Sequence, residues 1–154
     1  MTNNYILRRI RYTFKINDSK MISIFALADH EVTKEQISAW LKKEDDEAYK
    51  NCSDSQFSIF LNGFINDRRG KKEGAAGQPE KNLNNNIILR KLKIALDLKN
   101  EDMLEIMDLA DLKVSKHELS AFFRRPDHKH YRPCKDQILR NFITGMQLKY
   151  RPDK

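Results

Sequence analysis

The stretch NNYILRRIRYTF, residues 3–14, occurs again as NNIILRKLKIAL, residues 85–96. The likeness extends further, because shifting the chain by 82 positions aligns Asn3 to Phe64 with Asn85 to Met146 without a gap. Roughly twenty of the about 62 aligned pairs are identical. A repeat of this length indicates one supersecondary unit used twice, so whatever fold the first half adopts is expected in the second.

Apolar residues in each half follow a helical period. Ile6, Leu7, Ile10 and Phe14 recur every three to four residues, which predicts an amphipathic helix and not a strand. The same reading of the remaining segments gives four helices in each half, and therefore an all-α protein of two homologous four-helix units. The second helix of each half is expected to bury these residues: Met21, Ile22, Phe25 and Leu27, with their copies Met103, Leu104, Met107 and Leu109.

Polar residues with short side chains mark the helix starts, since they can accept hydrogen bonds from the free backbone NH groups. The third helix has the clearest signal, the capping box S/T-x-x-E/Q, formed by Thr33 with Gln36 and by Ser115 with Glu118. The predicted N-caps of the other helices are Asn3 or Asn4, Asp18 and Asp54, with their copies Asn85 or Asn86, Asn100 and Asp136. Gly63 and Gly145 lie inside the fourth helices, which predicts a close approach to another helix, with the packing of the two halves as one place for it.

Composition divides the chain into a first unit at residues 1–66, a basic linker containing Gly, Pro and Asn at 67–84, and a second unit at 85–150. The order of the second and third helices is that of a helix-turn-helix. The formal net charge of +7 is uneven, because residues 1–65 are neutral, 66–85 carry +2 and 86–154 carry +5. We therefore expect positive potential over the linker and second unit, which favours a polyanionic partner.

Several functional classes find no support in the sequence. No apolar run approaches the roughly 18 residues that a membrane span needs, and the N-terminal stretch is interrupted by arginines. With only Cys52 and Cys134 a disulfide framework is not expected, so we predict a cytoplasmic protein without a membrane association. No catalytic or nucleotide-binding motif was found, and we predict neither an enzyme nor a cofactor.

The segment RPDHKHYRPCKDQ, residues 125–137, is a candidate metal or redox site because it gathers His128, His130 and Cys134. The copy in the first half has Asp46, Ala48 and Cys52 at these positions, so both histidines are missing from it. The residues that recur are Asp45/Asp127, Tyr49/Tyr131, Cys52/Cys134 and Asp54/Asp136. Recurrence favours a structural role, with tyrosine and cysteine buried and the second aspartate capping the fourth helix. The two histidines, which have no copy, would add positive charge to the loop when they are protonated.

Basic residues on the first helices, the third helix and this loop are candidate phosphate contacts. The set comprises Arg8, Arg11, Arg90, Lys93, Lys116, Arg124, Arg125, Lys129 and Arg132. As a reading helix, the third helix would present Lys34, Glu35 and Ser38, or Lys116, His117 and Ser120, to DNA. The basic residues of the first helices are explained equally well as the solvated face of an amphipathic helix.

The repeated segments resemble the YehS family of bacterial proteins, whose members contain two copies of one short domain of unknown function. The resemblance rests on NNNIILRKLKIAL and VSKHELSAFFRRPDHKHYRPCKDQILRNFITGM in the second half, and on ISAWLKKEDDEAYKNCSD and FLNGFI in the first. It implies a two-copy architecture and supplies no established activity, cofactor or catalytic residue. Two hypotheses remain, a protein that binds DNA or RNA and an adaptor that docks another protein.

Overall fold

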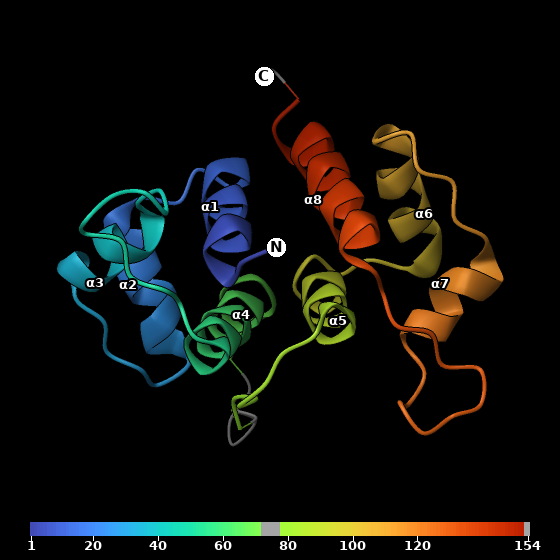
Figure 1. The fold of residues 1–154 in the computed structure, drawn as a ribbon, viewed down its shortest axis with the longest axis horizontal. Coiled ribbons are helices and arrows are strands. Elements are labelled where there is room, and N and C mark those ends of the chain that lie inside the picture. Colours follow the sequence, from blue (N-terminus) through green and yellow to red (C-terminus); the bar gives the residue numbers. More distant parts are fainter. Residues whose placement is uncertain (72–77, 153–154) are drawn as a thin grey trace. The chain divides into compact units, whose positions relative to one another are not determined.

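The computed structural model describes residues 1–71 and 78–152. In this described part every regular element is an α-helix, and the chain forms two compact units, Met1–Leu83 and Asn84–Lys154 (Figure 1). None of these helices is long and apolar enough to cross a membrane. The prediction of an all-α protein built from two four-helix units is confirmed.

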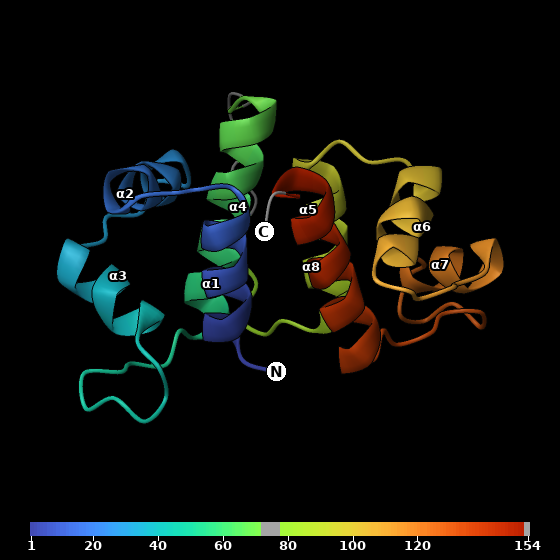
Figure 2. The ribbon, with the colours of Figure 1, turned by 90° about the horizontal axis from the view of Figure 1, so that it is seen from above.

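The first unit contains α1 (Asn3–Thr13), α2 (Asp18–Leu27), α3 (Lys34–Leu41) and α4 (Asp54–Arg69). Helix α4 packs along α2, and α1 contacts both α3 and α4. Two views at right angles show α2 and α3 on one side of the α1–α4 pair (Figures 1 and 2). Phenylalanine fills the core, where the Phe25 ring lies 5.5 Å from Trp40 and 5.6 Å from Phe60 between centroids.

The second unit repeats this arrangement with α5 (Asn85–Ala95), α6 (Asn100–Leu109), α7 (Lys116–Phe122) and α8 (Asp136–Tyr150). Helix α8 packs along α6, and α5 contacts α8. Leu139, Phe142 and Met146 of α8 are fully buried.

Both predicted capping boxes are present at the start of α3 and α7. The N-caps predicted for the other six helices were wrong by one or two positions. The residues at these N-cap positions are Thr2, Asn17, Ser53, Asn84, Lys99 and Lys135, of which the two lysines make no side-chain cap hydrogen bond. At α4 the reason is a second capping box of the same type, Ser53 with Gln56, which places Asp54 inside the helix.

The prediction for the second helices is confirmed at Met21 and Phe25 and at their copies Met103 and Met107, which are fully buried, and was wrong for the rest of the stripe. Ile24 and Ile106 are fully buried, while Ile22 is only half-buried and Leu109 is 49% exposed. The two isoleucines are buried because they lie where α2 and α6 come closest to the glycines of α4 and α8.

Gly63 and Gly145 make the close helix approach that their position predicted, but within each unit. A Cβ atom added to Gly63 would lie 2.0 Å from the carbonyl oxygen of Ile24, and one added to Gly145 would lie 1.9 Å from that of Ile106. The suggestion that these glycines pack the halves together was therefore wrong. Each glycine lets two helix backbones of one unit touch.

The segment predicted as a linker at 67–84 begins inside a helix, since α4 continues to Arg69. Further along, the backbone NH of Glu80 donates to Ser58 Oγ at 2.9 Å, and the NH of Leu83 donates to Asp54 Oδ2 at 2.9 Å. Residues 78–83 therefore belong to the first unit. The middle of the predicted linker, residues 72–77, lies outside the described residues.

Candidate functional site

Each unit has one long loop between its third and fourth helices, and the two loops share a backbone scaffold. The NH of Lys50 donates to the carbonyl of Ala39 at 3.1 Å, and that of Arg132 donates to the carbonyl of Ala121 at 3.2 Å. We call residues 42–53 the first loop and residues 124–135 the second loop. Both turn back onto the helix that precedes them.

A buried asparagine on the first helix of each unit clamps this loop. The side-chain amide of Asn86 donates to the carbonyls of Phe122 at 3.0 Å and Arg132 at 2.8 Å, and its oxygen accepts from the NH of Cys134 at 2.9 Å. Asn4 makes the equivalent three bonds in the first unit, at 2.8 to 2.9 Å. These residues were predicted as alternative N-caps, and they instead fix the loop to the helix.

The preceding asparagine ties the start of the last helix to the first helix. Asn85 Nδ2 donates to Asp136 Oδ1 at 2.7 Å, and Asn3 does the same to Asp54 at 2.8 Å. The hydrogen bond from Asn85 lowers the pKa of the Asp136 carboxyl because it favours the charged form. The two aspartates therefore link helices and do not cap them.

Cys52 and Cys134 are free and buried, as predicted, whereas Tyr49 and Tyr131 are only half-buried. Burial raises the pKa of the Cys52 thiol to about 12, and the negative charge of Asp54 acts in the same direction. Burial also raises the pKa of Cys134 to about 12, with Asp136 adding to it. A thiol with such a pKa is a poor nucleophile at neutral pH.

Both thiols are therefore expected to resist iodoacetamide at pH 8 in the native protein and to react fully in denaturant, as intact mass spectrometry would show. Because the unfolded thiols ionise near the ordinary value of 9.0, their contribution to stability is complete below pH 9 and is lost as the pH rises toward 12. Fast labelling of the native protein would contradict the burial of either sulfur.

The charge of the two loops differs although their scaffold is shared. The first loop has three basic and four acidic residues, a net charge of −1. The second loop has five basic residues and one acidic residue, a net charge of +4, together with His128 and His130. All of its charged residues are exposed. Positive charge is therefore concentrated and exposed in the second loop.

Four of the predicted phosphate contacts lie together in this second loop: Arg124, Arg125, Lys129 and Arg132. Arg125 forms an exposed ion pair with Asp127 at 3.1 Å. Lys116 is exposed at the first position of α7, the helix that the loop turns back on.

The basic residues of α5 lie next to this loop. The ammonium of Lys93 lies 4.9 Å from the ring centroid of Phe123, the residue that precedes the second loop. Arg90 is three residues earlier on the same helix and is exposed, so both residues lie on one face. The predicted contacts of the second unit thus form one region.

The predicted contacts of the first unit are engaged within that unit. Arg11 forms an ion pair with Asp18 at 2.6 Å, and Arg8 reaches the carbonyl of Lys42 at 3.4 Å. Both side chains are only partly exposed, which leaves them less available to an external phosphate than the residues of the second loop.

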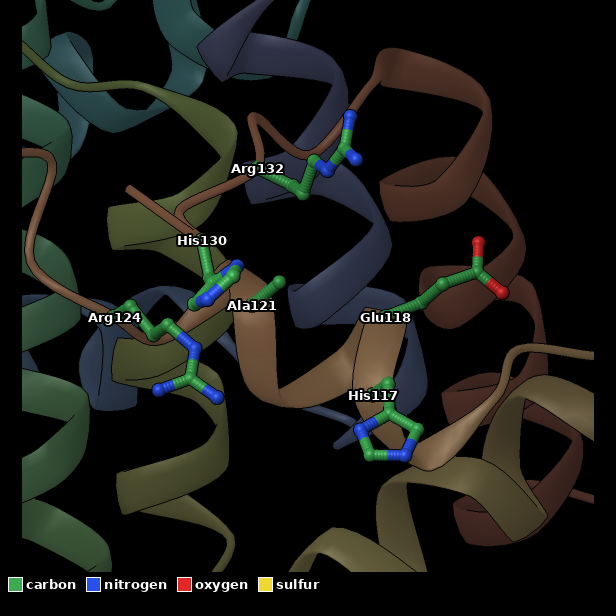
Figure 3. Close-up of a pocket in the computed structure, with 6 residues that line it drawn as sticks. All are labelled: His117, Glu118, Ala121, Arg124, His130 and Arg132. Atoms are coloured by element: carbon green, nitrogen blue, oxygen red, sulfur yellow. The ribbon is translucent and has the colours of Figure 1, made fainter. Parts of the chain in front are cut away.

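A pocket of 370 Å³ lies between α7 and the second loop. It is lined by His117, Glu118, Ala121, Arg124, His130 and Arg132 (Figure 3). The sequence reading missed that His117 and His130 face one pocket. A comparison of the repeats contains the signal, since the equivalent positions are Glu35 and Ala48. Among residues 1–71 and 78–152, no group of three or more His, Cys, Asp or Glu side chains could hold a metal ion.

Comparison with known proteins supports the repeat and adds no activity. The family model described as "Protein of unknown function (DUF1456)" matches residues 3–70 and again residues 85–151. The "Uncharacterized protein YehS" of Escherichia coli (strain K12) is 46% identical over 155 residues, covering 100% of this chain and 99% of that protein. No solved structure matches the chain.

Proposed function

Because the chain belongs to the DUF1456 family of proteins of unknown function, its role must be argued from its surface, and we propose that the second unit binds nucleic acid without catalysing a reaction. The observation that carries the proposal is the contrast between two loops on one scaffold, −1 in the first and +4 in the second. Because both loops share one backbone arrangement, folding does not require this difference in net charge. Binding of phosphate groups would account for it.

The proposed contacts are the exposed cations around the second loop. Arg125 and Lys129 lie in the loop, while Arg90 and Lys116 extend the surface onto α5 and α7. Arginine presents a planar fork that suits phosphate oxygens, and lysine adds a mobile point charge. In this proposal the third helix and its loop act together, as a helix-turn-helix-like surface of a cytoplasmic protein.

Fluorescence anisotropy with labelled duplex DNA, single-stranded DNA and structured RNA tests the proposal. With probes that lack a terminal phosphate, the logarithm of the binding constant should fall linearly with the logarithm of the salt concentration between about 50 and about 200 mM. The double variant Arg125→Glu/Lys129→Glu should weaken binding at least ~10-fold at low salt and reduce the salt slope by about two. The preferred probe would identify the class of nucleic acid.

The first loop offers a matched control, Lys43→Glu/Lys50→Glu. Both lysines are exposed, and this variant changes the net charge by the same amount on the equivalent scaffold. It should bind nearly as well as the wild type. Equal weakening by both double variants would mean that only the overall charge matters. No binding at low salt would reject the proposal in favour of an adaptor that docks another protein.

A further inference from the structure

The pocket beside α7 combines two guanidinium groups, two imidazoles and one carboxylate. In Figure 3, Arg124 and His130 lie on one side of Ala121, Glu118 lies on the other, and Ala121 forms the floor between them. Ala121 is 6% exposed, so its small side chain leaves the space above it open. The volume of 370 Å³ is at the small end of the range for ligand pockets, which suits a single nucleotide and not a strand.

The backbone holds the cationic side of this pocket in place. The NH of Arg132 is bonded to the carbonyl of Ala121, and its own carbonyl accepts from the buried Asn86 at 2.8 Å. The NH of His130 donates to Nδ1 of His128 at 3.0 Å, within a turn closed by the bond from Tyr131 NH to the His128 carbonyl. The loop backbone therefore needs little further ordering when an anion binds.

The charges in the pocket are available to an external ligand. Within the described residues neither Arg124 nor Arg132 has an ion-pair partner. The Glu118 carboxylate accepts from the NH of Ser115 at 3.2 Å through one oxygen, as part of the capping box of α7. Its exposed position leaves acceptor capacity for a hydroxyl donor.

We propose that this pocket binds the terminal phosphate of a nucleic-acid strand, a phosphomonoester, with the 2′-hydroxyl that this nucleotide carries in RNA directed toward Glu118. The proposal rests on the nucleic-acid binding proposed above. A terminal phosphate carries nearly two charges and three free oxygens, which two arginine forks and an imidazole match better than they match an internal diester. A pocket that holds one nucleotide also suits a strand end.

At the positions equivalent to this pocket, the first unit has the same alanine and different charged residues around it. Ala39 corresponds to Ala121, while Lys42 and Lys50 replace the arginines, and Ala48 replaces His130. The chain therefore provides its own control. A variant that fills the pocket can be compared with the same substitution at the equivalent position of the other unit.

The test compares one oligonucleotide carrying a hydroxyl, a 5′-phosphate or a 3′-phosphate at its end, with free nucleoside monophosphate as competitor. One phosphorylated form should bind roughly 10-fold more tightly than the hydroxyl form. Ala121→Leu should remove this difference and leave binding of the hydroxyl form unchanged, while Ala39→Leu should preserve it. Arg132→Gln should also remove the difference in affinity between the phosphorylated and hydroxyl forms. Because Arg132 is exposed, this variant can replace Ala121→Leu if the latter does not fold.

The outcomes separate this inference from the proposed function. Equal binding of all three strands would overturn the assignment of the pocket to a terminal phosphate and would leave the proposed nucleic-acid binding intact. Binding of phosphorylated strands alone would support the pocket and count against the loop as a general phosphate surface. If free nucleoside monophosphate bound as tightly as the strand end, the pocket would be a nucleotide site and the assignment to a strand end would be overturned.

Discussion

Replacement of Gly145 by alanine is expected to destabilise the second unit by roughly 3 kcal/mol. The new methyl group would lie 1.9 Å from the carbonyl oxygen of Ile106, far inside van der Waals contact. The methyl group is attached directly to the α8 backbone and the carbonyl is part of the α6 backbone, so α6 and α8 would have to separate along their main contact. The helix propensity gained over glycine, about 1 kcal/mol, offsets only part of this loss. Urea unfolding, followed by circular dichroism, measures the difference.

Gly63→Ala should have a similar effect on the first unit, because its Cβ would meet Ile24 in the same way. Gly70→Ala is the control, since nothing lies within 4 Å of a Cβ there. Its φ of 87° makes it mildly unfavourable for alanine, by about 1 kcal/mol. If Gly145→Ala were no less stable than Gly70→Ala, the close helix approach would not exist in solution.

The repeat made most of the fold predictable. Once the two halves were aligned, signals that are ambiguous alone became reliable because they occurred twice, as with the capping boxes at Thr33 and Ser115. The intrahelical glycines were recognised in the same way. Their partner was not, since a glycine indicates that something comes close and does not identify it.

Local patterns misplaced the helix starts because several polar residues stand next to one another. In Asn3-Asn4 and Asn85-Asn86 the side chains can cap a helix, yet tertiary contacts use them differently. Asn86 bonds to groups 36 to 48 residues away, which no local window contains. The role of Asp54 and Asp136 was missed for the same reason, because their partners Asn3 and Asn85 lie on another helix.

The candidate site was predictable in its charge and not in its shape. The basic residues of the second loop are visible in the sequence alone, and they gave the candidates Arg124, Arg125, Lys129 and Arg132. The pocket needed the structure, because His117 and His130 line one pocket only where the loop turns back onto α7. That turn depends on the buried Asn86.

Loss of Asn86 is therefore expected to affect both stability and binding. Asn86→Ala removes three hydrogen bonds and leaves the buried NH of Cys134 without its acceptor, which should destabilise the second unit by about 3–5 kcal/mol. Asn86→Asp keeps the acceptor but directs a carboxylate oxygen at two backbone carbonyls. Burial and repulsion disfavour its charged form, so its stability should improve as the pH is lowered from about 7 toward 4. Urea unfolding at several pH values measures both effects.

Asn4 provides the comparison that separates folding from function. Asn4→Ala removes the same three bonds in the first unit and should destabilise that unit to a similar extent. Only Asn86→Ala frees the loop that carries Arg124 and Arg132, so only this variant should weaken nucleic-acid binding at a temperature where both variants remain folded. Equal binding by the two variants would show that the fixed shape of the second loop is not needed, and that its charge alone accounts for binding.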